Sequence, residues 1–183
     1  DALLEKVISQ GGVVHMNAPV DEIITKDGKS AGTRSSDKIY SADAVLATVS
    51  VPTFLGMTPQ LPEEYVKRIS SVSYQNSVCV ILKLKKSLSD YYWINISDPD
   101  SPFVGIIEHT KLVSPENYGS FNLVYLTKYT SAKDEMYSKP DEEIYKIFIT
   151  RLKRIFPDIN DADIKEHWVF RDRHSQPIFV KDY

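Results

Sequence analysis

Cysteine and glycine are both scarce in this chain, and each scarcity excludes a class of site. Cys79 is the only cysteine among the 183 residues, so no internal disulfide and no cysteine-rich zinc site can form. The seven glycines include no Gly-x-Gly-x-x-Gly loop of the kind that binds phosphate at a helix N-terminus. The four histidines have no zinc-site spacing. We therefore expect no metal site. The histidines are His15, His109, His167 and His174.

Long hydrophobic runs and a strong charge of one sign are also absent. No apolar run approaches the roughly 18 residues that cross a bilayer, so we expect no transmembrane segment. The 22 basic residues are outnumbered by 25 acidic ones, for a net charge of −3. This balance gives no basic surface for nucleic acid. A single cysteine favours a reducing compartment, and we expect a cytoplasmic protein.

The first fifty residues predict a helix followed by a small β-meander. Residues 2–10 place four apolar side chains on one helical face, and Gly11 is a natural stop. Short strands are expected at Val13-Val14, residues 20–24, Ile39-Tyr40 and residues 44–47. Asp27-Gly28 is a strong hairpin turn between two of them.

The rest of the chain predicts a mostly antiparallel sheet with covering helices. Residues 74–85 alternate apolar and polar side chains, as a strand with one covered face requires. Further strands are expected at 91–96, 103–109, 122–129 and 164–170. A loop or short helix is expected after Pro52, and a short helix after Pro62. Residues 140–156 carry one apolar stripe, with acidic residues first and basic residues last, as a helix dipole favours. The predicted fold class is α+β.

These patterns resemble the flavin-dependent amine oxidoreductase superfamily, which includes monoamine oxidases, protoporphyrinogen oxidases and phytoene desaturases. The similarity lies in Gly11-Gly12 after a helix, Asn17-Ala18-Pro19-Val20-Asp21-Glu22-Ile23, and the segment Ala42-Asp43-Ala44-Val45-Leu46-Ala47-Thr48. It implies that residues 1–57 are part of an FAD-binding domain. Residues 58–176 would form a substrate-binding α+β domain, and 177–183 would begin the return toward the FAD domain.

The resemblance implies two cofactor contacts. In that family the valine backbone holds the adenine of FAD, which corresponds to Val20, and the strand-end threonine lies beside the cofactor, which corresponds to Thr48. Since the phosphate loop is absent from the sequence, we expect an internal fragment of a flavoenzyme that is inactive alone. FAD would be bound by the full-length parent and not retained by this fragment. Apolar surface exposed by such a truncation would favour self-association.

Four residues are candidates for contact with a small-molecule substrate: Tyr92, Trp93, His109 and Gln176. The aromatic pair follows from the aromatics that flank substrates in many amine oxidases; core packing is the alternative. His109 ends a predicted strand, where functional residues are common, and Gln176 precedes the predicted return toward the flavin. Catalytic residues stay unassigned. Cys79, in the middle of an apolar strand, is expected to behave as a small hydrophobe.

Three functions remain open from the sequence. The first is hydride transfer from an amine, alcohol or unsaturated substrate to FAD, which the resemblance implies. The second is a flavin-dependent sugar-nucleotide mutase, which needs clustered arginines that the sequence does not present. The third is a non-enzymatic α+β binding module.

Overall fold

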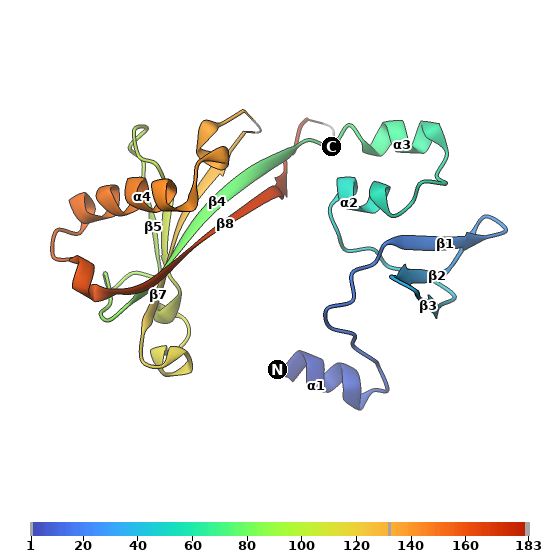
Figure 1. Cartoon of the computed structure of the whole chain (residues 1–183), viewed down its shortest axis with the longest axis horizontal. Helices are drawn as coiled ribbons and strands as arrows, with labels where there is room; N and C mark the ends of the chain where they lie inside the picture. Colours follow the sequence, from blue (N-terminus) through green and yellow to red (C-terminus); the bar gives the residue numbers. More distant parts are fainter. Residues whose placement is uncertain (1, 132, 182–183) are drawn as a thin grey trace. The chain divides into compact units, whose positions relative to one another are not determined.

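The computed structural model describes residues 2–131 and 133–181, and its contacts divide the chain into two compact units at Val72 and Ser73. Each unit has its own antiparallel sheet, and all the strand pairs described are antiparallel (Figure 1). This is the predicted α+β fold class. The boundaries at residues 57 and 176 that we inferred from the family resemblance remain predictions, and the last two residues of segment 177–183 lie outside the described part.

The first unit holds a three-stranded sheet and three helices. The helices are α1 (Ala2–Ser9), α2 (Val51–Gly56) and α3 (Glu63–Ile69), and the strands are β1 (Glu22–Lys26), β2 (Lys29–Ser35) and β3 (Lys38–Ser41). The predicted Asp27-Gly28 hairpin is confirmed, with both residues at positive φ. The loop after α2 is fixed to β1, because the Ile23 amide donates to the Met57 carbonyl at 2.9 Å.

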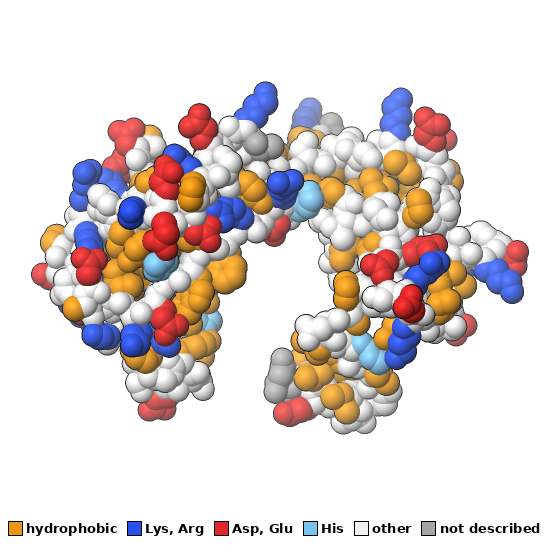
Figure 2. Space-filling view, viewed as in Figure 1, with side chains coloured by type: hydrophobic (Ala, Val, Ile, Leu, Met, Phe, Trp, Pro, Cys, Tyr) orange, Lys and Arg blue, Asp and Glu red, His pale blue; other side chains and the backbone are white. Residues whose placement is uncertain are grey.

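Two strands predicted in this unit do not form. Residues 13–14 and 44–47 have no strand assignment, and their backbone groups make no hydrogen bonds to the described residues. A β-strand requires backbone hydrogen bonds to a neighbouring strand. Among the described residues, no strand lies in position to pair with these two segments. Their apolar side chains are consequently exposed, including Val13 at 75% and Leu46 at 89%. Figure 2 shows hydrophobic side chains gathered over α1 in the same unit.

The second unit is a five-stranded sheet with one long helix. The strand order is β5-β6-β7-β4-β8. The strands are β4 (Tyr74–Leu84), β5 (Trp93–Asn95), β6 (Gly105–Glu108), β7 (Asn122–Thr130) and β8 (Ile164–Pro177). The helix is α4 (Asp141–Ile155), and four 3₁₀ turns, η1 (His109–Lys111), η2 (Pro115–Tyr118), η3 (Glu135–Ser138) and η4 (Asp161–Asp163), complete the unit.

One face of this sheet packs against α4 and forms the main hydrophobic core. Every second residue of β4 from Val78 to Leu84 is fully buried, which confirms the predicted alternation. Phe148 of α4 meets Phe103 edge to face, with ring centroids 5.5 Å apart. The opposite side of α4 carries charged side chains of both signs (Figure 2). The helix therefore covers one face of the sheet, and the same alternation directs the other residues of β4 to the second face.

Strand β8 is longer than predicted. It pairs with β4 as far as Pro177, and two register shifts interrupt the ladder. Its last third is polar and lies along the first residues of β4, so the length of β4, rather than the pattern of β8 itself, sets how far the strand continues.

Candidate functional site

The second face of the five-stranded sheet carries a row of large apolar side chains. Register partners across the strands place Trp93 opposite Ile107, Ile107 opposite Tyr125, Tyr125 opposite Ile81, and Ile81 opposite Trp168. Directly paired residues lie on the same face of a sheet, so these five side chains form one continuous row. We call it the aromatic row. It spans four strand spacings, about 19 Å at about 4.8 Å each.

The aromatic row is open rather than covered. Trp93 is 52% exposed and Trp168 39%, whereas the residues facing α4 are buried. Phe170, in the neighbouring row beside Cys79, is 54% exposed. Exposed apolar side chains that adjoin one another in this way are typical of interaction or ligand-binding surfaces. A hollow of about 440 Å³ lies over the β7, β4 and β8 part of this face. It is lined by Ile81, Lys83, Tyr118, Leu123, Tyr125, Glu166, Trp168 and Phe170.

A polar cluster adjoins the aromatic row at Tyr125. The Nε2 atom of His109 lies 2.7 Å from the hydroxyl of Tyr118, and the His109 ring contacts Tyr125 with centroids 5.8 Å apart. Burial, and then the neighbouring Tyr118, Cys79 and Tyr92, raise the pKa of Tyr125 above its ordinary value. The tyrosine therefore stays protonated at neutral pH and offers a hydroxyl group to the open face.

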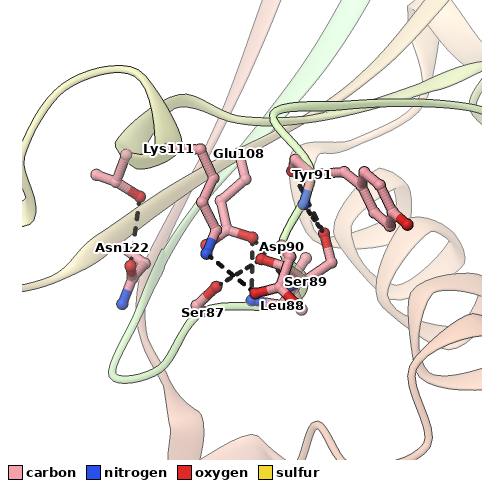
Figure 3. Close-up of polar contacts among 9 residues, drawn as sticks. Ser87, Leu88, Ser89, Asp90, Tyr91, Glu108, Lys111 and Asn122 are labelled. Atoms are coloured by element: carbon pink, nitrogen blue, oxygen red, sulfur yellow. Dashed lines mark hydrogen bonds and ion pairs between the residues drawn. The ribbon is translucent and has the colours of Figure 1, made fainter.

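Glu108 is the last residue of β6, the strand that leads to this cluster. Its side chain fixes β6 to the loop that precedes β5. The side chain is 1% exposed, and its Oε2 atom accepts hydrogen bonds from the amides of Leu88 and Ser89 at 3.1 and 3.2 Å (Figure 3). The Glu108 amide donates to the Tyr92 carbonyl at 2.8 Å. Alternation along β6 thus sends Glu108 inward and leaves His109 beside the open face. Residues 88–93 are fixed to the same strand.

Three of the four predicted substrate residues come together in this region. Trp93 ends the aromatic row, His109 contacts Tyr125, and Tyr92 is bound through its carbonyl to the strand that precedes His109. Gln176 does not join them, since it lies opposite Gln75 near the far end of β8. Four further residues of this region were not predicted from the sequence: Tyr118, Tyr125, Trp168 and Phe170. The only signal for the last two was the alternation of residues 166–170.

The two predicted cofactor residues lie in the first unit. Val20 lies two residues before the start of β1 and is 39% exposed, and its backbone N–H and C=O have no partner among the described residues. Thr48 is exposed, in the segment after β3 that has no helix or strand assignment. Within the described ranges there is no group of three or more His, Cys, Asp or Glu residues positioned to hold a metal ion, and no helix is long and apolar enough to cross a membrane.

Solved structures with the same fold include an oxidoreductase, a candidate oxidase and a mutase. An oxidoreductase from Methanosarcina mazei aligns with 93% of this chain at 22% identity and a TM-score of 0.72. A candidate protoporphyrinogen oxidase from Exiguobacterium sp. 255-15 aligns with 98% at 14% identity and a TM-score of 0.70. Reduced UDP-galactopyranose mutase aligns with 96% at 16% identity and a TM-score of 0.70.

The chain spans less than half of each of these proteins: 41%, 40% and 38% of their lengths, respectively. No curated protein sequence matches it. A family model described as flavin containing amine oxidoreductase matches residues 1–178, which is nearly the whole chain. The fold and this match agree with the resemblance seen in the sequence, and the chain belongs to the flavin containing amine oxidoreductase family.

Proposed function

We propose that these residues form part of an FAD-dependent oxidoreductase that takes a hydride from an amine, an alcohol or an unsaturated compound. The family membership supports FAD as the cofactor. One structural observation supports a substrate-binding role for the second unit. The second unit has a sheet with one face buried by α4 and one face open, aromatic and hollowed. Such a face provides the wall of a substrate cavity, since ligand sites are concave and mostly apolar with a few polar groups.

The residues of the first unit fit the assigned cofactor role. An adenine ring is held through its donor and acceptor edge, and the unpartnered N–H and C=O of Val20 offer a matching pair. The Thr48 hydroxyl is exposed and free to contact the cofactor. When bound, FAD supplies the hydride acceptor. The protein would contribute orientation, exclusion of water by the aromatic row, and hydrogen bonds from the His109–Tyr118 cluster.

The test of this proposal is the visible absorption spectrum of the complete gene product that contains these residues. We expect flavin bands and the release of FAD on heat denaturation. Bleaching of those bands by an amine, alcohol or unsaturated substrate without oxygen would identify an oxidoreductase. A colourless, folded protein that cannot be loaded with FAD would refute the proposal and favour a non-enzymatic binding module.

A backbone variant tests the Val20 assignment. Val20→Pro removes the amide hydrogen, while Val20→Ala keeps it and changes only the side chain. Loss of one hydrogen bond is worth about 1 kcal/mol, so we expect Val20→Pro to weaken FAD binding by about fivefold or more. Val20→Ala should bind FAD nearly as the unmodified protein does. Equal affinities in both variants would exclude a hydrogen bond from the Val20 amide N–H to FAD.

A flavin-dependent mutase is the second candidate, and the fold shared with UDP-galactopyranose mutase keeps it open. Such an enzyme would need arginines for a nucleotide diphosphate. In the second unit Arg171 is engaged by Asp141 and by two backbone carbonyls, and Arg151 by Asp98. Neither residue belongs to the hollow on the open face. Substrate-driven net reduction of the flavin would separate an oxidoreductase from a mutase.

A further inference from the structure

We propose that the outer side of α4 binds a small phosphate monoester, at a site separate from the open face. A hollow of about 610 Å³ is formed by this side of the helix and by the loop between β5 and β6. We call it the outer hollow. Because α4 packs on the sheet through its opposite side, the proposal does not depend on the oxidoreductase function. The outer hollow is lined by Asp98, Asp100, Pro102, Lys146, Ile147, Thr150, Arg151 and Arg154.

The loop that forms one wall of the outer hollow is fixed to α4. The Asp98 carboxylate accepts a hydrogen bond from the Asp100 amide at 2.9 Å and forms an ion pair with Arg151. The buried Ser101 hydroxyl donates to the Phe103 carbonyl at 2.7 Å, and the Phe103 ring packs on the helix. This wall is therefore preorganised, which lowers the cost of binding a ligand.

Lys146 lines the outer hollow and has no carboxylate partner among the described residues. One turn earlier on the helix are Glu142 and Glu143, the residues with which a lysine at this position would ordinarily pair. Glu142 instead lies 3.5 Å from His167, and Glu143 forms an ion pair with Lys139. The ammonium group of Lys146 is consequently available to a ligand.

Arg154 is a second available cation. Its neighbours one turn earlier are Thr150 and Arg151, so no carboxylate of α4 is in position to pair with it. The helix dipole favours a basic residue in the last turn, but it does not account for Lys146, which lies outside that turn. Two available cations therefore line the same hollow, on either side of Thr150 in the sequence.

These groups match the chemistry of a phosphate monoester. Such an ester carries nearly two negative charges above about pH 7, and a guanidinium group binds phosphate through two parallel hydrogen bonds. The phosphate would be held by Lys146 and Arg154. A hollow of this volume has room for the organic part of the ester as well. The exposed carboxylate of Asp100, which can only accept hydrogen bonds, would bind a hydroxyl group of that part.

Two-dimensional NMR spectra of the backbone amides test the site directly. The buffer contains no phosphate and has an ionic strength of about 0.1 M and a pH of about 7.5. Glucose 6-phosphate is the probe, and glucose and inorganic phosphate are its controls. We expect saturable shifts at residues 98–102 and 146–154 with the probe, weaker binding of inorganic phosphate, and no saturable shift with glucose. The titration needs neither FAD nor turnover, so its failure would leave the oxidoreductase proposal untouched.

Two variants remove the available cations, and a third is the matched control. Arg154→Gln and Lys146→Gln should each weaken binding of glucose 6-phosphate by about tenfold or more, since each loses charge-assisted hydrogen bonds. Lys153→Gln removes a cation of the same helix that pairs with Asp161 and does not line the outer hollow. Its affinity should change by less than about twofold, because salt screens the distant charge. Asp100→Asn should bring the affinities for glucose 6-phosphate and inorganic phosphate closer together.

Three results would overturn the proposal. The first is the absence of a saturable shift with glucose 6-phosphate, or an equal response to glucose. The second is an equal loss of affinity in Lys153→Gln and Arg154→Gln. The third is binding to phosphatidylcholine vesicles that contain phosphatidic acid by a chain that does not bind glucose 6-phosphate, which would assign the cations to a lipid surface. The amide spectrum of each variant shows whether its fold is kept, so a lost response reports on the site.

Discussion

Trp93 and Trp168 stand at opposite ends of one row of side chains that crosses all five strands of the second sheet. They are separated by 75 positions in the sequence, yet the ladder register brings them to the same face. Trp93 is 52% exposed, Trp168 is 39% exposed, and the Trp93 indole N–H donates to Asn95 at 2.7 Å. Tryptophan fluorescence of this protein therefore reports on the open face and not on the core.

The first prediction follows from that exposure. Acrylamide should quench Trp93 and Trp168 efficiently in the folded chain, with constants close to those after unfolding in urea. The single variants Trp93→Phe and Trp168→Phe assign each contribution. A folded chain in which either tryptophan is strongly protected from acrylamide would show that this end of the row is covered.

The second prediction concerns the thiol of Cys79. Burial raises its pKa to about 11, and only the thiolate is nucleophilic. At neutral pH its thiolate fraction is therefore about 300-fold below that of a free cysteine with a pKa near 8.5. Alkylation by iodoacetamide should be slow at pH 7 and should accelerate as the pH rises toward 11.

The matched control for Cys79 is a cysteine placed at an exposed position. Leu46→Cys in a Cys79→Ser background puts the thiol at a site that is 89% exposed. This control thiol should react rapidly at pH 7 and reach its full rate near pH 9. Similar rates for the two thiols at pH 7 would mean that Cys79 is not shielded in the sheet.

The third prediction concerns Glu108. Glu108→Ala leaves the amides of Leu88 and Ser89 without their acceptor, and each unsatisfied buried group costs about 1–3 kcal/mol. We expect a loss of about 2–4 kcal/mol in the free energy of unfolding, measured by urea titration. Glu166→Ala, which breaks a surface ion pair with Lys83, should cost less than about 1 kcal/mol. Comparable losses in the two variants would contradict the proposed anchoring role.

The fourth prediction concerns the exposed apolar residues of the first unit. Met16 and Leu46 are 77% and 89% exposed in segments without a neighbouring strand, so we expect the chain to self-associate as its concentration rises. The double variant Met16→Lys/Leu46→Lys should shift sedimentation velocity profiles toward the monomer. Tyr91→Lys, at a residue 69% exposed in the second unit, is the control. Profiles unchanged by the double variant would place any association elsewhere.

The sequence correctly predicted those elements whose pattern lies entirely within their own residues. The alternation of β4, the apolar stripe of α4 and the Asp27-Gly28 turn all appear where the sequence placed them. The strands expected at 13–14 and 44–47 were wrong because ladder hydrogen bonds depend on a neighbour, which hydrophobicity does not encode. The polar end of β8 was missed because its pairing follows from β4.

The candidate site depends more heavily on long-range register. Trp93 was named from the family resemblance and His109 from its place at the end of a predicted strand. Their relation to the open face required the pairing of β5, β6 and β7. Tyr125 and Trp168 carried no local signal that distinguished them from core aromatics. The roles of Val20 and Thr48 came from the family resemblance alone and remain predictions.

The hydrogen bond between Ser73 and Ile178 brings the beginning of the second unit next to the residue that follows β8. The Ile178 amide donates to the Ser73 carbonyl at 2.8 Å, next to the Tyr74–Pro177 pair that opens the ladder. The first residues of this unit therefore lie beside the end of β8 and are hydrogen-bonded to it. A unit whose first and last residues lie side by side can be inserted into another protein without changing the path of the surrounding chain. Under the proposed function, exchange of this unit would change substrate preference and leave the residues proposed to bind the cofactor unchanged.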